Sequence, residues 1–176
     1  MRSLFGLLFV ACVTAPAYGA TPAPAIPAAT SAQARVSISG WHLDCNPGKT
    51  ALTCRVSNQI VQNPGGALLI GFIFGATSDG KTALTMQVPL GASVSSPIGV
   101  SITGGPSQSF SYLTCSQQGC FATGSVNADL ITAMRSDKGE IHVTYTMLDD
   151  NLAGHDVTAT ISLSGFSQVY DRLHNP

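Results

Sequence analysis

Apolar and polar side chains alternate along most of the chain after about residue 35. A period of two is typical of strands that bury one face and expose the other. Turn-forming dipeptides rich in Gly, Pro, Asn and Asp separate the alternating runs. The expected inward positions are Val36 and Ile38; Trp41, Leu43 and Cys45; Leu52, Cys54, Val56 and Ile60; Leu84, Met86 and Val88; Ile98, Val100 and Ile102; Phe110 and Tyr112; Ile141, Val143, Tyr145 and Met147; Val157, Ala159, Ile161 and Leu163.

Two places depart from simple alternation. The apolar phase shifts at Gly40, which predicts a β-bulge inside one long strand. Residues 67–76, with the sequence A-L-L-I-G-F-I-F-G-A, show no alternation. The length and the two glycines of this run argue against a helix, so we expect a strand that is buried on both faces. The following residues, Ser78 to Lys81, carry the hairpin signal S-D-G-K.

A helical period is confined to a short segment after Asn127. Asn127 is a good N-cap, and Leu130, Ile131 and Met134 form a one-sided stripe that ends near Arg135. Residues 165–173 are compatible with a short terminal helix or with a last strand. Short strands at regular spacing with little helix predict a mainly β fold, a single antiparallel β-sandwich or barrel-like domain over residues 35–176 with one or two short helices.

The N-terminal segment predicts export. Residues 1–20 combine Arg2 with an apolar run and small residues near Gly19 and Ala20, the pattern of a cleaved signal peptide. The apolar run is shorter than the roughly 20 residues that span a bilayer. Cleavage is expected after Gly19 or Ala20, and a later cut after Ala34 is a second option. Lipidation at Cys12 is a further alternative, disfavoured because the apolar stretch before it is short. Residues 21–34 form a Pro/Ala-rich linker.

Charge and composition narrow the class of partner. Charged residues make up 10% of the chain and the formal net charge is −1, so there is no basic surface of the kind that binds nucleic acid. We therefore expect no nucleic-acid partner. We also expect no transmembrane span, because the N-terminal apolar run is too short to cross a bilayer.

Four cysteines follow the leader as two local pairs, Cys45 with Cys54 and Cys115 with Cys120. In an exported chain such pairs predict structural disulfides. A zinc site or a redox pair is the alternative, but both spacings are wider than those motifs use. Four cysteines allow three connectivities. We favour the two local bridges because each pair flanks a turn. Cross-strand geometry would place the Cα atoms of Cys45 and Cys54 about 5.5 Å apart, within bridging range.

The remaining candidates for chemistry carry no recognised motif. His42, His142, His155 and His174 are not arranged as metal ligands. The loop from Asp149 to Asp156 places its acidic and amide residues side by side rather than at the alternating positions of a calcium loop. We therefore predict no catalytic residue, no cofactor-binding residue and no metal ligand, and expect a non-enzymatic protein.

Several segments resemble the invasion-associated locus B family of exported bacterial proteins. They are Trp41 to Cys45 with Cys54, Val88 to Gly91, Phe110 to Cys115, Gly119 to Ala122, Leu130 to Met134, and Leu163 to Phe166 with Leu173. The resemblance implies a compact β-sandwich in the periplasm or at the outer membrane. It also implies a link to host-cell invasion in some members, and it brings no catalytic residues.

Two functions remain open from the sequence. The first is a non-enzymatic envelope protein that binds another protein or an envelope component. The second is a periplasmic hydrolase or carbohydrate-active enzyme, with the Asp149–Asp156 loop and Trp41 or Tyr112 lining a cleft. The first is favoured because the sequence contains no reactive cluster.

Overall fold

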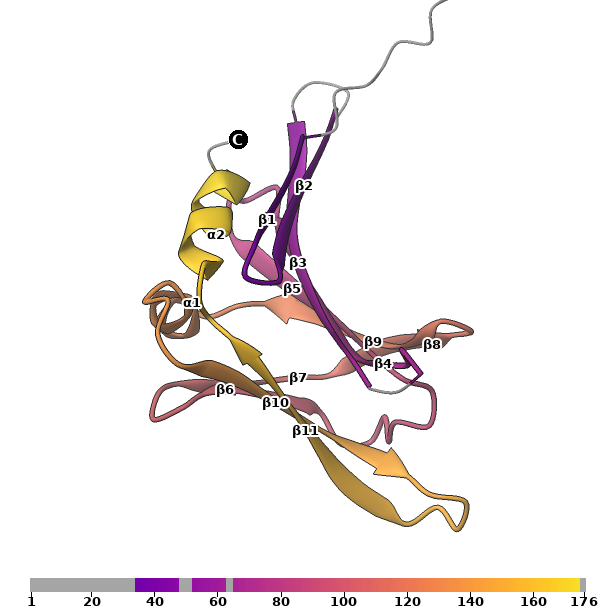
Figure 1. Ribbon diagram of the computed structural model, residues 1–176. Helices are drawn as coiled ribbons and strands as arrows, with labels where there is room; N and C mark the ends of the chain where they lie inside the picture. The colour runs from indigo at the N-terminus through magenta and orange to yellow at the C-terminus, as the bar shows by residue number, and fades with distance from the viewer. Residues whose placement is uncertain (1–33, 48–51, 63–64, 175–176) are drawn as a thin grey trace, which may run out of the picture. The chain divides into compact units, whose positions relative to one another are not determined.

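Antiparallel strands dominate the part of the chain that the structure describes. The computed structural model describes residues 34–47, 52–62 and 65–174, which form two sheets and two short helices (Figure 1). In spatial order the seven-stranded sheet consists of β1 (Ala34–Ile38), β2 (Trp41–Pro47), β3 (Leu52–Val61), β4 (Leu68–Ala76), β5 (Thr82–Val88), β9 (Gly119–Ser125) and β8 (Tyr112–Ser116). The four-stranded sheet consists of β11 (Gly154–Ser162), β10 (Glu140–Leu148), β6 (Ile98–Ile102) and β7 (Ser107–Phe110). The helices are α1 (Ala128–Met134) and α2 (Phe166–His174).

The mainly β fold with two short helices is confirmed. The predicted signal peptide and nearly all of the predicted linker lie outside the described residues. Strand β1 begins at Ala34, one residue before the expected start of the domain.

One hydrophobic core holds the inward face of the strands whose side chains are described, and Tyr112 of β8 packs against its edge. The period-two pattern is confirmed: along β2, β5, β6 and β10 the buried residues alternate with half-buried ones. Trp41, Leu84, Val100 and Ile141 are all at most 1% exposed. Burial of these side chains is the main stabilising term for a fold with so few charges.

The segment from residue 165 forms a helix rather than a last strand. The ring of Phe166 at the start of α2 lies 4.9 Å from that of Trp41 and 5.3 Å from that of Phe74, both in edge-to-face geometry. The indole Nε1 of Trp41 donates to the carbonyl oxygen of Ser162 at 3.0 Å. Helix α2 therefore covers the inner face of the larger sheet over β2 and β4.

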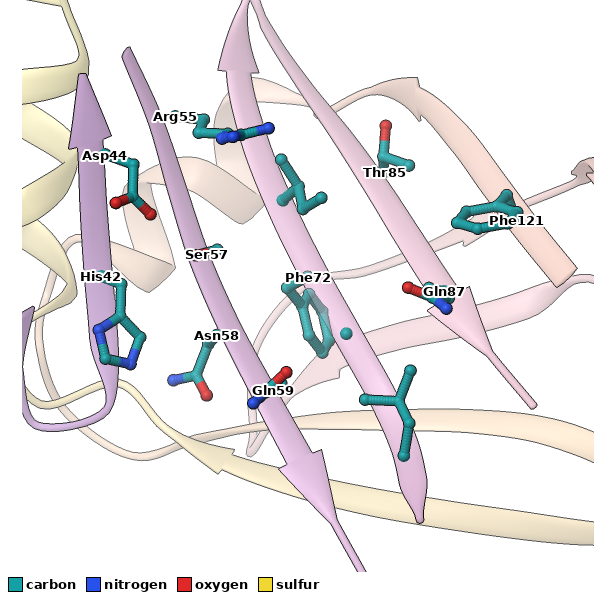
Figure 2. A pocket seen from close by; sticks show the side chains of 13 residues that line it. His42, Asp44, Arg55, Ser57, Asn58, Gln59, Phe72, Thr85, Gln87 and Phe121 are labelled. Atoms are coloured by element: carbon teal, nitrogen blue, oxygen red, sulfur yellow. The ribbon is translucent and has the colours of Figure 1, made fainter. Parts of the chain in front are cut away.

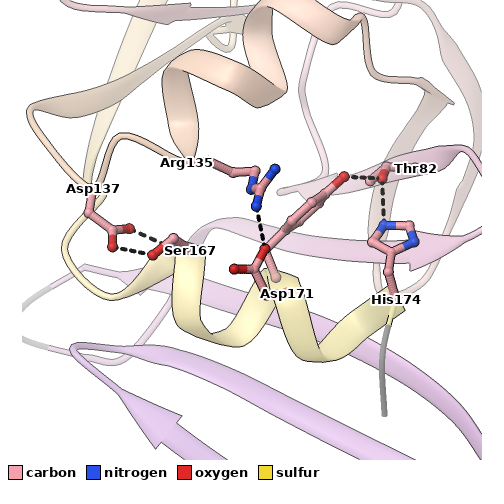
Figure 3. A network of polar contacts seen from close by, with 7 residues as sticks. Thr82, Arg135, Asp137, Ser167, Asp171 and His174 are labelled. Atoms are coloured by element: carbon pink, nitrogen blue, oxygen red, sulfur yellow. Dashed lines mark hydrogen bonds and ion pairs between the residues drawn. The ribbon is translucent and has the colours of Figure 1, made fainter.

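Polar contacts fix α2 on its other sides (Figure 3). Arg135, which follows α1, donates to Asp171 at 2.7 Å. The hydroxyl of Thr82, at the start of β5, lies 2.5 Å from that of Tyr170 and 3.1 Å from Nε2 of His174. These contacts connect α2 to α1 and to the larger sheet.

The expected β-bulge at Gly40 is wrong. Ile38 pairs with Trp41, so Ser39 and Gly40 are the two-residue loop of the β1–β2 hairpin. Their φ angles are +49° and +84°, as in the turn type that suits the twist of antiparallel strands. The apolar phase shifts here because the chain reverses direction, not because one strand contains an extra residue.

The expectation that residues 67–76 are buried on both faces is also wrong. Phe72 and Phe74 are at most 1% exposed on the inner face of β4, but Ile73 on the outer face is 40% exposed. Its outward neighbours are Gly71 and Gly75, which are half-buried. The run contains no polar residue, yet its outer face is not covered. Two of the outward positions are glycines, so this face exposes little apolar side-chain surface.

Two local signals are confirmed. The side-chain oxygen of Asn127 accepts a hydrogen bond from the backbone N–H of Leu130 at 2.8 Å, and α1 begins at the next residue after its cap. The S-D-G-K segment connects β4 to β5, with Gly80 at a φ of +78°.

Candidate functional site

Both cysteine pairs form disulfides in the structure. Cys45 stands directly opposite Cys54 on β2 and β3, and Cys115 stands opposite Cys120 on β8 and β9. The Cα atoms are 4.0 Å apart in each pair, closer than the distance of about 5.5 Å expected from typical bridges. This spacing is nearer to the ~4.5 Å of a non-hydrogen-bonded antiparallel pair. The four sulfur atoms are therefore committed to bridges and are not metal ligands.

The second disulfide holds a turn against β5. The carbonyl oxygen of Gln118, in the turn, accepts from Nε2 of Gln87 at 2.6 Å. Gly119 approaches β5 so closely that a Cβ there would lie 2.3 Å from the carbonyl oxygen of Val88. Only glycine fits at this position, and the turn is thereby attached to the larger sheet.

The outer face of the larger sheet contains a hollow of about 600 Å³ (Figure 2). Its residues come from β2, β3, β4, β5 and β9, the consecutive strands at the centre of that sheet. The lining residues are His42, Asp44, Arg55, Ser57, Asn58, Gln59, Leu68, Gly71, Phe72, Ile73, Thr85, Gln87 and Phe121.

Strand register explains how the hollow is made. Gln59 pairs with Gly71, Gly71 with Gln87, and Gln87 with Phe121, so these four residues form one row across β3, β4, β5 and β9. We call Gln59, Gly71, Gln87 and Phe121 the glutamine row. Gly71 has no side chain, so a gap separates the two glutamines. A Cβ on Gly71 would meet Cβ of Gln87 at 3.8 Å and Oε1 of Gln87 at 4.0 Å.

Hydrogen-bonding groups in the hollow are open to a ligand. Within the described ranges, the side chains of His42, Arg55, Ser57 and Gln59 make no hydrogen bond or ion pair with the protein. Gln87 uses its amide nitrogen on Gln118, which leaves its amide oxygen as an acceptor beside Gly71. Such groups can bind a polar molecule without first breaking internal bonds.

Charges of both signs lie at one end of the hollow. Asp44 on β2 is directly opposite Arg55 on β3, and His42 is directly opposite Ser57. The hollow thus has no strong potential of a single sign, which disfavours a highly charged ligand.

The residues suggested for a hydrolase do not come together. Trp41 is fully buried in the core. Asp149 accepts hydrogen bonds from the backbone N–H groups of Asn151 and Ala153, both at 2.8 Å, and so closes its own turn between β10 and β11. Tyr112, on the edge strand β8, lines a different and smaller hollow of about 320 Å³ together with Val94 and Leu113. These residues therefore form no common cleft.

Tyr112 has an unusual environment for a tyrosine. Its hydroxyl is buried and has no hydrogen-bond partner among the described residues. Burial, followed by the nearby Tyr145, raises the pKa of the Tyr112 phenol. Burial also raises the pKa of Tyr145, whose hydroxyl donates to the carbonyl oxygen of Leu69 at 2.8 Å. Both phenols therefore stay protonated at neutral pH.

The histidines occupy four separate places. His42 lines the hollow, and His142 lies 2.7 Å from the hydroxyl of Thr103 on the four-stranded sheet. His174 contacts Thr82, and His155 is exposed on β11. In the described part of the chain, no three His, Cys, Asp or Glu residues are grouped as metal ligands.

The hollow was not identified from the sequence. The predicted inward positions of Cys54, Val56 and Ile60 imply that Arg55, Ser57 and Gln59 point outward, and these three residues do line the outer face. The signal that could have revealed the site is the pair of glycines in β4, Gly71 and Gly75, each directly after an apolar residue that faces inward. Their effect depends on which residues stand opposite them, and that depends on register.

Comparison with known proteins places the chain in a family. A family profile described as "Invasion associated locus B (IalB) protein" matches residues 41–174. The chain belongs to the invasion associated locus B family. The matched residues include every residue that lines the hollow, and the resemblance seen in the sequence is confirmed.

Two curated proteins and one solved structure are similar to the chain. The chain is 28% identical to two invasion protein B homologues of Brucella abortus, from strain 2308 and from biovar 1, over 135 residues that cover 76% of this chain and 75% of each relative. The crystal structure of invasion associated protein B from Bartonella henselae has the same fold, with a TM-score of 0.69 and 20% identity. That match covers 80% of this chain and 94% of the other.

Two structural features concern the cellular location of the protein. Among the described residues, neither helix has the length and apolar content needed to cross a bilayer. The two disulfides are consistent with a protein outside the cytoplasm, where such bonds form and persist.

Proposed function

We propose that this chain is a non-enzymatic protein of the bacterial cell envelope, located in the periplasm or at the outer membrane, that binds another protein or an envelope component. The observation that carries the proposal is the open hollow on the outer face of the larger sheet. Among the described residues, the side chains of His42, Arg55, Ser57 and Gln59 in the hollow make no hydrogen bond or ion pair with the protein. Ile73, on the central strand of the hollow, is 40% exposed. Concave surfaces with convergent polar groups are the usual places for ligands.

A role in host-cell invasion is part of the same proposal. It is supported by the family description and by the names of the Brucella abortus relatives. The proposed role in invasion depends on ligand binding at the outer face. A variant that loses this binding should therefore also lose the role in invasion.

Site-specific crosslinking tests the proposed binding face. A photoreactive amino acid at Ile73 is exposed within the hollow, and the same amino acid at Gln168 is exposed on α2 as the control. In living cells we expect a discrete crosslinked species from position 73 and none from position 168. Equal crosslinking at both positions, or none at position 73, would contradict the proposal.

A further inference from the structure

The glutamine row has the chemistry of a sugar-binding surface. An amide side chain both donates and accepts hydrogen bonds, which matches hydroxyl groups that do the same. Gln59 has no hydrogen-bond partner among the described residues, and Gln87 presents its amide oxygen beside Gly71. The two glutamines therefore stand on either side of Gly71, which has no side chain to separate them.

Phe121 supplies the apolar part of the row. It is half-buried and stands directly opposite Gln87 on β9. An exposed aromatic face can pack against the C–H face of a sugar ring while the ring's hydroxyls reach the neighbouring amides. The row crosses four adjacent strands, so it extends over about 14 Å, a length that suits a short run of sugar rings.

The position of the row disfavours an extended peptide. Peptides that bind sheets usually add a strand at an edge, where backbone groups are unpaired. The row instead lies on β3, β4, β5 and β9, whose backbone groups pair with neighbouring strands on both sides. Recognition at this face must therefore come from side chains, which suits a ligand rich in hydroxyl groups.

The charges nearby disfavour an anionic ligand. The hollow contains Asp44 opposite Arg55, and the row itself has no charged residue. Phosphate-rich ligands are held mainly by clustered basic residues. An uncharged polymer is the better match to this surface.

We infer that the glutamine row binds an uncharged polysaccharide chain, with Gln59 and Gln87 bonding to sugar hydroxyls and Phe121 packing against a ring face. This inference rests on the proposed function, because it names the class of envelope component that the outer face binds. No bond is made or broken in the ligand.

Filling the gap in the row is the sharpest test. Gly71→Val adds a β-compatible side chain between the two glutamines, at a position where a Cβ makes only ordinary contacts of 3.8–4.0 Å. Gly75→Val is the matched control, because Gly75 lies on the same face of the same strand, outside the hollow, and a Cβ there meets nothing within 4 Å. Urea unfolding establishes that both variants are folded.

The ligands are defined probes measured by calorimetry against the purified, disulfide-intact protein. They are uncharged tetrasaccharides of β-linked glucose, of mannose and of N-acetylglucosamine, a uronic acid tetrasaccharide, and an eight-residue extended peptide. We expect an uncharged tetrasaccharide to bind, Gly71→Val to weaken it at least about tenfold, and Gly75→Val to leave it within about twofold. Gln59→Leu, an exposed change, should also weaken it and serves if Gly71→Val does not fold.

The outcomes separate this inference from the proposed function. Binding of the peptide or of the uronic acid probe alone, sensitive to Gly71→Val, keeps the binding face and overturns the uncharged polysaccharide. Sugar binding that Gly71→Val leaves unchanged overturns the glutamine row as the site. No binding of any probe overturns the inference, while crosslinking at position 73 still decides the proposed function.

Discussion

Replacement of Trp41 gives the most direct test of what stabilises this fold. The side chain is fully buried, and its ring contacts those of Phe74 and Phe166, at centroid distances of 6.0 and 4.9 Å. Its indole N–H donates to the carbonyl oxygen of Ser162. Trp41 therefore joins β2, β4, α2 and the end of β11 at one point.

The structure sets the size of the expected loss. Trp41→Ala removes the whole ring from a packed site, which typically costs about 3–5 kcal/mol of unfolding free energy. Trp41→Phe keeps an aromatic ring but leaves the Ser162 carbonyl without its donor, at a cost of about 1–3 kcal/mol. Because single domains are stable by only about 5–15 kcal/mol, the alanine variant should be close to unfolding at physiological temperature.

Urea unfolding followed by far-ultraviolet circular dichroism measures these losses. Fluorescence cannot serve for the variants because the chain has a single tryptophan. Phe121→Ala is the control, since it removes an aromatic ring from the half-buried outer face of the same sheet. If Trp41→Ala costs less than about 1 kcal/mol, or no more than Phe121→Ala, then Trp41 does not hold α2 on the sheet.

Three further predictions concern local features. Replacing both Cys45 and Cys54 by alanine should lower the unfolding free energy by about 2.6 kcal/mol, from the loop entropy of a nine-residue separation; chemical denaturation measures it, and an unchanged midpoint would contradict the bridge as a staple. Asn127→Ala should cost about 1 kcal/mol by the same assay because it removes the cap of α1, and a loss below ~0.5 kcal/mol would show that the cap is dispensable. Hydrogen bonding from Thr77, and then the nearby Lys81, lowers the pKa of Asp79 from 3.8 to about 2. The contribution of this carboxylate to stability is therefore complete above pH 3.8 and lost as the pH falls through about 2. Carboxyl titration by NMR should show this, with Thr77→Val moving the pKa back toward 3.8; an unmoved titration would refute the role of Thr77.

Features that depend on neighbouring residues in the chain were predictable. The inward positions of β5 and β10 follow from alternation alone, and the cap at Asn127 follows from one side chain and the stripe after it. The error at Gly40 has a local origin as well. A phase shift at a glycine is produced equally by a bulge and by a tight turn, and only pairing between Ile38 and Trp41 distinguishes them.

The sequence does not indicate which sheet each strand joins. Phe110 and Tyr112 continue one alternating run, yet the chain leaves the four-stranded sheet after Phe110 and joins the seven-stranded sheet at Tyr112. The single residue between them, Ser111, carries no turn signal. The change is imposed by packing, because both segments can bury a face only where partner strands are available.

The candidate site belongs to the same class of property. Gln59, Gly71, Gln87 and Phe121 are ordinary residues along the chain, and only register makes them neighbours. A slip of one residue in any of these pairings would move a glutamine to the core face, which apolar burial forbids. Apolar alternation on the inner face therefore determines which polar residues meet on the outer face. The disulfide between Cys115 and Cys120 joins β8 to β9 and fixes the turn whose Gln118 carbonyl oxygen accepts from Gln87. It follows that reduction of this bridge should weaken binding at the glutamine row even where the protein stays folded.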